Sequence, residues 1–194
     1  MVVLSVILVL LVSANYYSRT QSNDLSAGSI RFDVGDPKPG DEAPDFTLQS
    51  VRSNMVTLSD YVGEYVLLYF QEGIMCQACW VQLQHIEDEF TQFEGIGIDR
   101  IITITTDPII PLAQKIDIEG IQTDVLSDPD VSISTIYTTN LYGMMGTNYN
   151  GHTFILISPD GDIVFRADYG GAPEYTMYVP IPVLLGDIEA NRID

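Results

Sequence analysis

Two cysteines carry the clearest chemical signal in this chain. They stand three residues apart, in Cys76-Gln77-Ala78-Cys79, after the apolar run Tyr65–Phe70. A helical pattern begins directly after Cys76, so we expect this residue at a helix N-terminus, where unpaired N–H groups and the helix dipole stabilise a thiolate. Cys79 lies one turn further and can close a short disulfide with Cys76. The spacing therefore predicts a dithiol pair in which Cys76 attacks and Cys79 resolves the mixed disulfide.

Two alternative interpretations of this motif are half of a metal site and a buried structural pair. A zinc site made of cysteines needs more ligands than one C-x-x-C supplies, and the sequence has neither a second cysteine pair nor a histidine pair nearby. A strand followed by C-x-x-C and a helix is typical of redox pairs. Since the sequence also has no nucleotide-binding glycine motif, we expect no metal ion and no organic cofactor.

The composition favours one globular domain and disfavours nucleic acid as a partner. The 194 residues are 46% hydrophobic, which is enough for a sizeable core. Acidic residues outnumber basic residues 27 to 8, which gives a net charge of −19. Because such a surface repels phosphate backbones, we expect no nucleic-acid binding.

The start of the chain differs in composition from the rest. Residues 1–17 hold an apolar run that ends in two tyrosines, residues that suit a membrane interface. The run is shorter than the roughly 20 residues that cross a bilayer, and residues 12–14 resemble a signal cleavage site. Residues 18–38 are polar and are expected to form a flexible linker. These features predict a domain, residues 39–194, that is membrane-anchored or exported, with its catalytic part outside the cytoplasm.

Within that domain the patterns alternate between strands and helices. Residues 65–70 are continuously apolar, as in a central strand covered on both faces, and residues 77–93 carry an apolar stripe at helical spacing. We expect further strands at 45–48, 56–58, 101–105, 153–157 and 162–167, and further helices at 111–118, 131–137 and 183–190. This order predicts an α/β domain whose central mixed sheet is flanked by helices on both faces.

Five motifs in sequence order resemble the redoxin branch of the thioredoxin superfamily, which contains the alkyl hydroperoxide reductases and thiol-specific antioxidant proteins. They are GDEAPDFTL at 40–48, TLSDY at 57–61, the pair Cys76 and Cys79, LSDP at 126–129, and ILISPDG at 155–161. The resemblance covers nearly all of residues 39–190. It implies a thioredoxin-like fold with a redox-active cysteine at a helix N-terminus.

The resemblance implies two activities, and the residues before Cys76 discriminate between them. Peroxidatic members carry Pro-x-x-x-Thr-x-x-Cys, whose threonine and a distant arginine position the peroxide. Here Gly73 replaces the threonine, no proline precedes it in the loop, and Glu72 adds a negative charge that opposes thiol ionisation. The adjacent C-x-x-C is similar to that of membrane-tethered thiol–disulfide reductases. We therefore predict a thiol–disulfide oxidoreductase that acts on disulfides of proteins or small thiols, with thiol peroxidase as the alternative.

Either activity requires a redox partner, which is a thiol reductant or an oxidant.

His152 is the third candidate catalytic residue, after Cys76 and Cys79. In the thioredoxin superfamily, a cis-proline usually packs against the redox disulfide, and it directly precedes the strand that here begins at Thr153. His152 holds that position in this chain. Because His152 is not a proline, we expect a trans peptide bond before it. By this analogy the imidazole lies beside Cys76 and pairs with the thiolate, relays a proton, or only fills space. His85, on the far side of the helix, is expected to be solvated.

Overall fold

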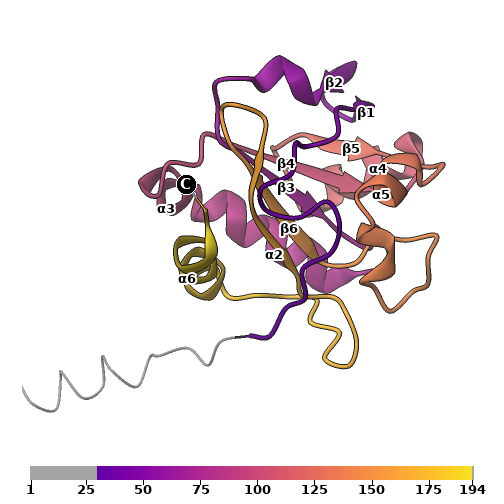
Figure 1. Cartoon of the computed structure of the whole chain (residues 1–194). Helices are drawn as coiled ribbons and strands as arrows, with labels where there is room; N and C mark the ends of the chain where they lie inside the picture. The colour runs from indigo at the N-terminus through magenta and orange to yellow at the C-terminus, as the bar shows by residue number, and fades with distance from the viewer. Residues whose placement is uncertain (1–29, 194) are drawn as a thin grey trace, which may run out of the picture.

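A computed structural model describes residues 30–193 of the chain. A seven-stranded mixed sheet forms its centre, in the order β2-β1-β5-β4-β3-β6-β7 (Figure 1). The strands are β1 (Thr47–Ser50), β2 (Met55–Thr57), β3 (Val66–Phe70), β4 (Arg100–Thr105), β5 (Val125–Ser127), β6 (Thr153–Ile157) and β7 (Ile163–Asp168). The helices are α2 (Gln77–Asp88), α3 (Phe90–Gly95), α4 (Ile109–Glu119), α5 (Ser132–Ile136) and α6 (Ile181–Asn191), with 3-10 turns η1 (Leu58–Tyr61) and η2 (Thr139–Leu141).

Strand β3 is central, as its apolar sequence predicts. All five of its side chains are buried, and it pairs in parallel with β4 and antiparallel with β6. Its side chains alternate between the faces of the sheet, so Tyr69 joins one apolar cluster and Phe70 the other. Because β3 ends at Phe70, the loop that follows places Cys76 beyond the carboxyl end of this central strand.

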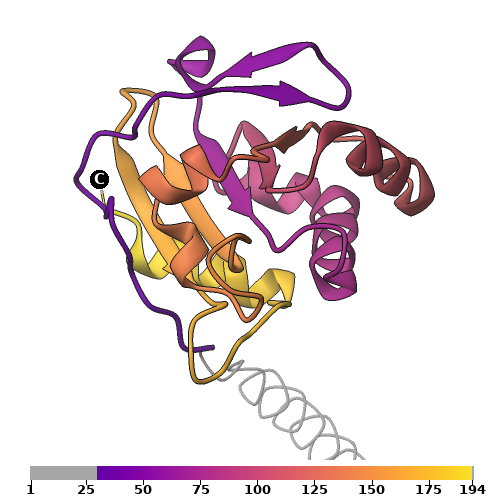
Figure 2. The same cartoon turned by 90° about the vertical axis from the view of Figure 1, so that its right-hand side faces the viewer.

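Helices cover both faces of the sheet, as predicted. The helices α2, α3, α4 and α6 contribute side chains to one cluster, with Trp80 of α2 packed among them. On the opposite face, α5 and the β1–β2 hairpin contribute to the other cluster, which includes Phe46 and Tyr137. Figure 2 shows the short α5 and the longer α6 on opposite sides of strands β6 and β7. The redox helix α2 therefore packs against a fully covered face of the sheet.

The predicted single helix over residues 77–93 is instead two helices. Glu89 has φ −110° and ψ 18°, and its backbone N–H donates to the carbonyls of His85 and Glu87, which ends α2. The chain then starts α3 at Phe90, and Phe93 lies in the same core cluster as Ile86. The apolar stripe identified the buried side chains, but it did not reveal the break between them.

Residues 30–38, here called the N-terminal arm, pack on the domain and do not form a free linker. Asp33 forms an antiparallel bridge with Asp168 of β7, and the ring of Phe32 lies edge-on to Tyr169 at 5.3 Å. The N–H of Gly35 donates to the carboxylate of Asp168 at 2.7 Å. These contacts therefore place residues before the predicted boundary at residue 39 against the sheet, and the boundary itself stays a prediction. Composition concealed the arm because much of its attachment is made by backbone groups.

The predicted membrane segment, residues 1–17, lies outside the described residues. The same holds for the predicted linker as far as residue 29. Within residues 30–193, no helix has the length and apolar character that a bilayer crossing requires. Membrane attachment and export stay predictions.

Candidate active site

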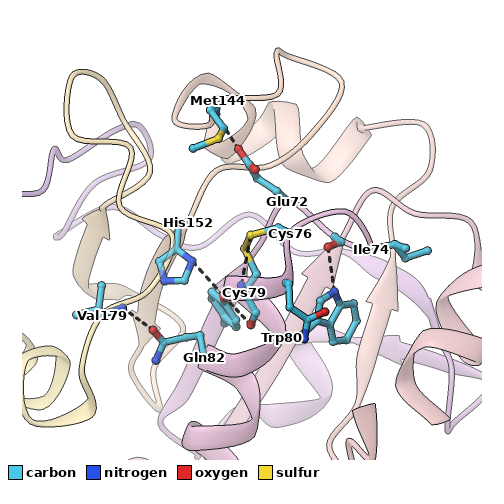
Figure 3. The surroundings of a disulfide bond; sticks show 12 residues. Glu72, Ile74, Cys76, Cys79, Trp80, Gln82, Met144, His152 and Val179 are labelled. Atoms are coloured by element: carbon cyan, nitrogen blue, oxygen red, sulfur yellow. Dashed lines mark hydrogen bonds between the residues drawn. A yellow bond between two sulfur atoms is a disulfide. The ribbon is translucent and has the colours of Figure 1, made fainter. Parts of the chain in front are cut away.

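Cys76 and Cys79 form a disulfide at the start of α2 (Figure 3). Their Cα atoms are 5.4 Å apart. Cys76 is the N-cap of the helix, and its Sγ accepts a hydrogen bond from the backbone N–H of Cys79 at 3.3 Å. The predicted placement of both cysteines is confirmed. The same Cys79 N–H also donates to the Cys76 carbonyl at 3.1 Å, so the two acceptors share it. Because this donor lies at the start of a helix, the geometry suits a Cys76 thiolate.

The two cysteines differ in exposure. Cys76 keeps 9% of its surface exposed, and Cys79 is completely buried. The neighbours Met75, Gln77 and Ala78 are exposed, Met75 by 75% of its surface. A reactant from solution therefore meets Cys76 first, although this residue is more enclosed than its position at a helix end suggested.

Three residues before Cys76, the backbone requires glycine. Gly73 has φ +88°, and a Cβ at this position would overlap the carboxylate of Asp107. The same carboxylate accepts a hydrogen bond from the N–H of Ile74 at 2.8 Å, and the indole N–H of Trp80 donates to the Gly73 carbonyl at 3.0 Å. These contacts fix the loop before the redox helix. They also leave no room for a threonine at position 73.

A buried acid, Glu72, lies on this loop, and a partly buried acid, Asp107, lies against it. Glu72 is 2% exposed, and its Oε1 accepts from the N–H of Met144 at 2.7 Å. Burial raises the pKa of Glu72, and hydrogen bonds from the backbone of Met144 and Met145 offset this only in part. Burial likewise raises the pKa of Asp107. The electrostatic surroundings of Cys76 are therefore acidic and poorly solvated.

His152 lies in the surroundings of the disulfide (Figure 3), directly before β6 and joined by a trans peptide. It is completely buried, and its Nδ1 is 3.1 Å from Oη of Tyr69. Burial lowers the pKa of His152 to about 3, so its imidazole is neutral near pH 7. A neutral ring opposes the predicted ion pair with a thiolate, because the imidazolium form would have to be created in a dry site. The predicted proton relay stays a prediction.

Two side chains of α2 attach the redox helix to the segment between β7 and α6. His85 is half-buried, with Nδ1 2.7 Å from Oη of Tyr178, so the prediction of a merely solvated histidine was wrong. Gln82 is completely buried and accepts from the N–H of Val179 at 2.6 Å. Sequence reasoning missed Gln82. Its signal was a polar residue adjoining the apolar stripe, beside Leu83.

The described residues provide neither a metal cluster nor a guanidinium that is free in the core. No group of three His, Cys, Asp or Glu side chains between residues 30 and 193 is arranged to hold a metal ion. Arg166, on β7, forms a fully buried ion pair with Asp168 at 2.8 Å and donates to the carbonyl of Pro37. This guanidinium is therefore committed to the N-terminal arm and to β7.

Comparisons with known proteins give a consistent result. The model of the AhpC/TSA family matches residues 39–166. A putative peroxiredoxin of Mycobacterium tuberculosis is 32% identical over 130 residues, which are 65% of this chain and 82% of that protein. Peroxiredoxin Bcp of Escherichia coli is 31% identical over 131 residues, again 65% and 82% of the two chains.

Solved structures confirm the predicted thioredoxin-like fold. The crystal structure of peroxidoxin BcpB from Mycobacterium tuberculosis superposes with a TM-score of 0.63 at 21% identity, and covers 80% of this chain and 98% of that one. AhpC of Enterococcus faecalis gives a TM-score of 0.65 at 14% identity, with 78% and 90% coverage. At these identities the likeness concerns the fold alone.

Proposed function

Because the chain belongs to the AhpC/TSA family, as its motifs predicted, we propose that it is a thiol peroxidase that reduces hydroperoxides at Cys76. The names of its relatives support this activity over the thiol–disulfide exchange that we predicted first. Peroxide reduction was the alternative in our sequence analysis. The comparisons therefore reverse the order of the two predictions.

In the proposed reaction, the Cys76 thiolate attacks one oxygen of the hydroperoxide and the O–O bond breaks. Cys76 takes the attacked oxygen with its proton and becomes a sulfenic acid. The departing alkoxide takes one proton from solvent, which balances the proton lost when the Cys76 thiol ionised, and leaves as the alcohol. The Cys79 thiol then attacks the sulfenic sulfur, so that the disulfide forms and water leaves. Two thiol groups of a reductant restore the dithiol and become a disulfide themselves. Each turnover thus reduces one hydroperoxide and oxidises two thiols.

One observation carries this proposal. The disulfide between Cys76 and Cys79 is closed while residues 77–88 remain helical. The resolving step therefore needs no unwinding of α2, because the second thiol lies one turn from the N-cap. The Cys76 sulfur also keeps its hydrogen bond from the Cys79 N–H, which would stabilise the attacking thiolate.

Thiol–disulfide exchange is the second candidate, and the loop before Cys76 favours it. Gly73 allows no threonine hydroxyl to hold a peroxide, and the acids Glu72 and Asp107 oppose a thiolate. Exchange with a disulfide needs the same dithiol but no peroxide-binding group.

Pre-reduced protein separates the two candidates. We expect it to consume one equivalent of hydroperoxide far faster than free cysteine does, and to end as the intramolecular disulfide. The Cys79→Ser variant should still consume one equivalent and yield a sulfenic acid that dimedone traps, and Cys76→Ser should consume none. If the wild type reduces insulin disulfides but reacts with hydroperoxide no faster than free cysteine, the exchange activity replaces the peroxidase.

A further inference from the structure

A buried carboxyl group stands beside the redox pair and has no assigned role. Glu72 is four residues before Cys76. The N–H of Cys76 donates to the carbonyl of Gly73, the residue after Glu72, at 3.0 Å, so the chain turns between them. Figure 3 shows Glu72 beside the disulfide, with its carboxyl group directed to Met144. With 2% of its surface exposed, Glu72 has almost no contact with water.

The known partners of this carboxyl group carry no charge. The N–H of Met144 donates to its Oε1 at 2.7 Å, and none of the ion pairs found among the described residues includes Glu72. The cationic side chain of Lys115 on α4 reaches Gln77 at the start of the redox helix at 2.9 Å and pairs with Glu119 at 2.6 Å.

The ionisable groups on the elements around Glu72 do not compensate its charge either. They are Tyr69 on β3, Cys76 at the N-cap of α2, Cys79 on α2, Asp107 after β4, Tyr142 after η2, and His152 before β6. His152 is neutral near pH 7 because burial lowers its pKa to about 3. An ionised Glu72 is therefore an uncompensated negative charge at the dithiol site.

We propose that Glu72 is a positioning residue that acts through the charge of Cys76: its carboxylate opposes the thiolate form and makes the Cys76–Cys79 pair a stronger reductant. The inference rests on the proposed function only in taking these cysteines as a redox pair. Reduction adds two electrons to the disulfide, and the product holds two protons as a dithiol or one as a thiolate and a thiol. Because two adjacent negative charges repel, the site with ionised Glu72 keeps the second proton.

The proposal has a consequence for the reaction with peroxide. Since only the thiolate attacks, Glu72 restrains Cys76 near neutral pH. Removal of the charge should speed the attack there. A residue that merely supported the fold would slow the attack when it is replaced.

Glu72→Gln tests the charge alone, because the amide oxygen can still accept from Met144. Asp160→Asn is the matched control, since it removes one charge at the exposed turn between β6 and β7. Two readouts need no peroxide and therefore do not depend on the peroxidase proposal. They are the thiolate absorbance of reduced protein titrated against pH, and the equilibrium of the pair with a glutathione buffer above the Cys76 pKa.

We expect Glu72→Gln to lower the Cys76 pKa by about one unit. The equilibrium with glutathione should shift about tenfold toward the reduced protein, which corresponds to about 30 mV. Asp160→Asn should change neither quantity. If Glu72→Gln leaves both unchanged, and only Glu72→Ala, which also loses the Met144 hydrogen bond, alters them, then the contact and not the charge matters and the proposal is wrong.

Discussion

Oη of Tyr69 lies 3.1 Å from Nδ1 of His152, and it also donates to the backbone carbonyl of Cys79 at 3.3 Å. A phenol has one proton to donate. When it donates to the Cys79 carbonyl, the contact with His152 is a hydrogen bond only if Nδ1–H donates to Oη. The other ring nitrogen, Nε2, is then unprotonated, and it is buried without a partner. If Tyr69 donates to the Cys79 carbonyl, its contact with His152 therefore requires the tautomer that is protonated at Nδ1.

A buried neutral His152 should make the fold sensitive to acid. Burial lowers its pKa from 6.5 to about 3, so the unfolded chain takes up a proton that the folded chain does not. The stabilisation is complete above pH 6.5 and is lost as the pH falls toward 3. Between pH 7 and pH 5 the loss should be about 2 kcal/mol.

The comparison with His152→Asn isolates this effect in urea unfolding at both pH values. The raised pKa values of Glu72 and Asp107 act in the opposite direction, because their stabilisation is lost as the pH rises. Glu72 and Asp107 are present in both wild type and His152→Asn, so their contributions cancel when the two losses of stability are compared. Equal losses of stability for wild type and variant would show that His152 does not cause the acid sensitivity.

Gly73→Ala should lower the free energy of unfolding by more than the cost of placing an alanine in a left-handed backbone conformation. Gly161→Ala is the control, because Gly161 has φ +93° but open space where a Cβ would stand. The left-handed backbone should cost the control about 1–2 kcal/mol. Gly73→Ala must also displace the Asp107 carboxylate, so we expect a total of about 3 kcal/mol or more in denaturant unfolding. Equal losses in the two variants would mean that Asp107 moves aside freely.

The elements that the sequence predicted well are those with a local signal. The apolar run of β3 and the ILISPDG hairpin of β6 and β7 depend on periodicity and turn residues, and the N-cap position of Cys76 depends on its neighbours in the chain. The features that were missed depend on partners far along the chain. Examples are the hydrogen bond from the N–H of Met144 to buried Glu72 and the close approach of Gly73 to the Asp107 carboxylate. Neither pair shows a pattern that reveals which residues meet.

The difference in exposure between the cysteines should appear in their reactivity. Pre-reduced protein treated briefly with iodoacetamide should be alkylated at Cys76, with little product at Cys79, because only Cys76 keeps exposed surface. Peptide mass spectrometry measures the two products, and the same reaction in denaturant should modify both residues. Preferential alkylation of Cys79 in the folded protein would reverse the roles assigned to the two thiols.

The N-terminal arm should be part of the stable domain. Arg166 and Asp168 form an ion pair whose side chains are completely buried. The arm completes their hydrogen bonds, since the Pro37 carbonyl accepts from Arg166 and the Gly35 N–H donates to Asp168. A chain that begins at residue 39 loses both groups, as well as the ring of Phe32.

A charged group in the core that loses a hydrogen-bond partner costs about 1–3 kcal/mol, so removal of residues 30–38 should cost about 3 kcal/mol or more. We expect a chain that begins at residue 30 to retain the full stability of the domain, and a chain that begins at residue 39 to unfold at lower urea concentration. Phe32→Ala in the longer chain measures how much of the loss is apolar packing. The remainder belongs to the polar contacts with Arg166 and Asp168. Identical unfolding midpoints for the two chain lengths would return the arm to the role of a linker.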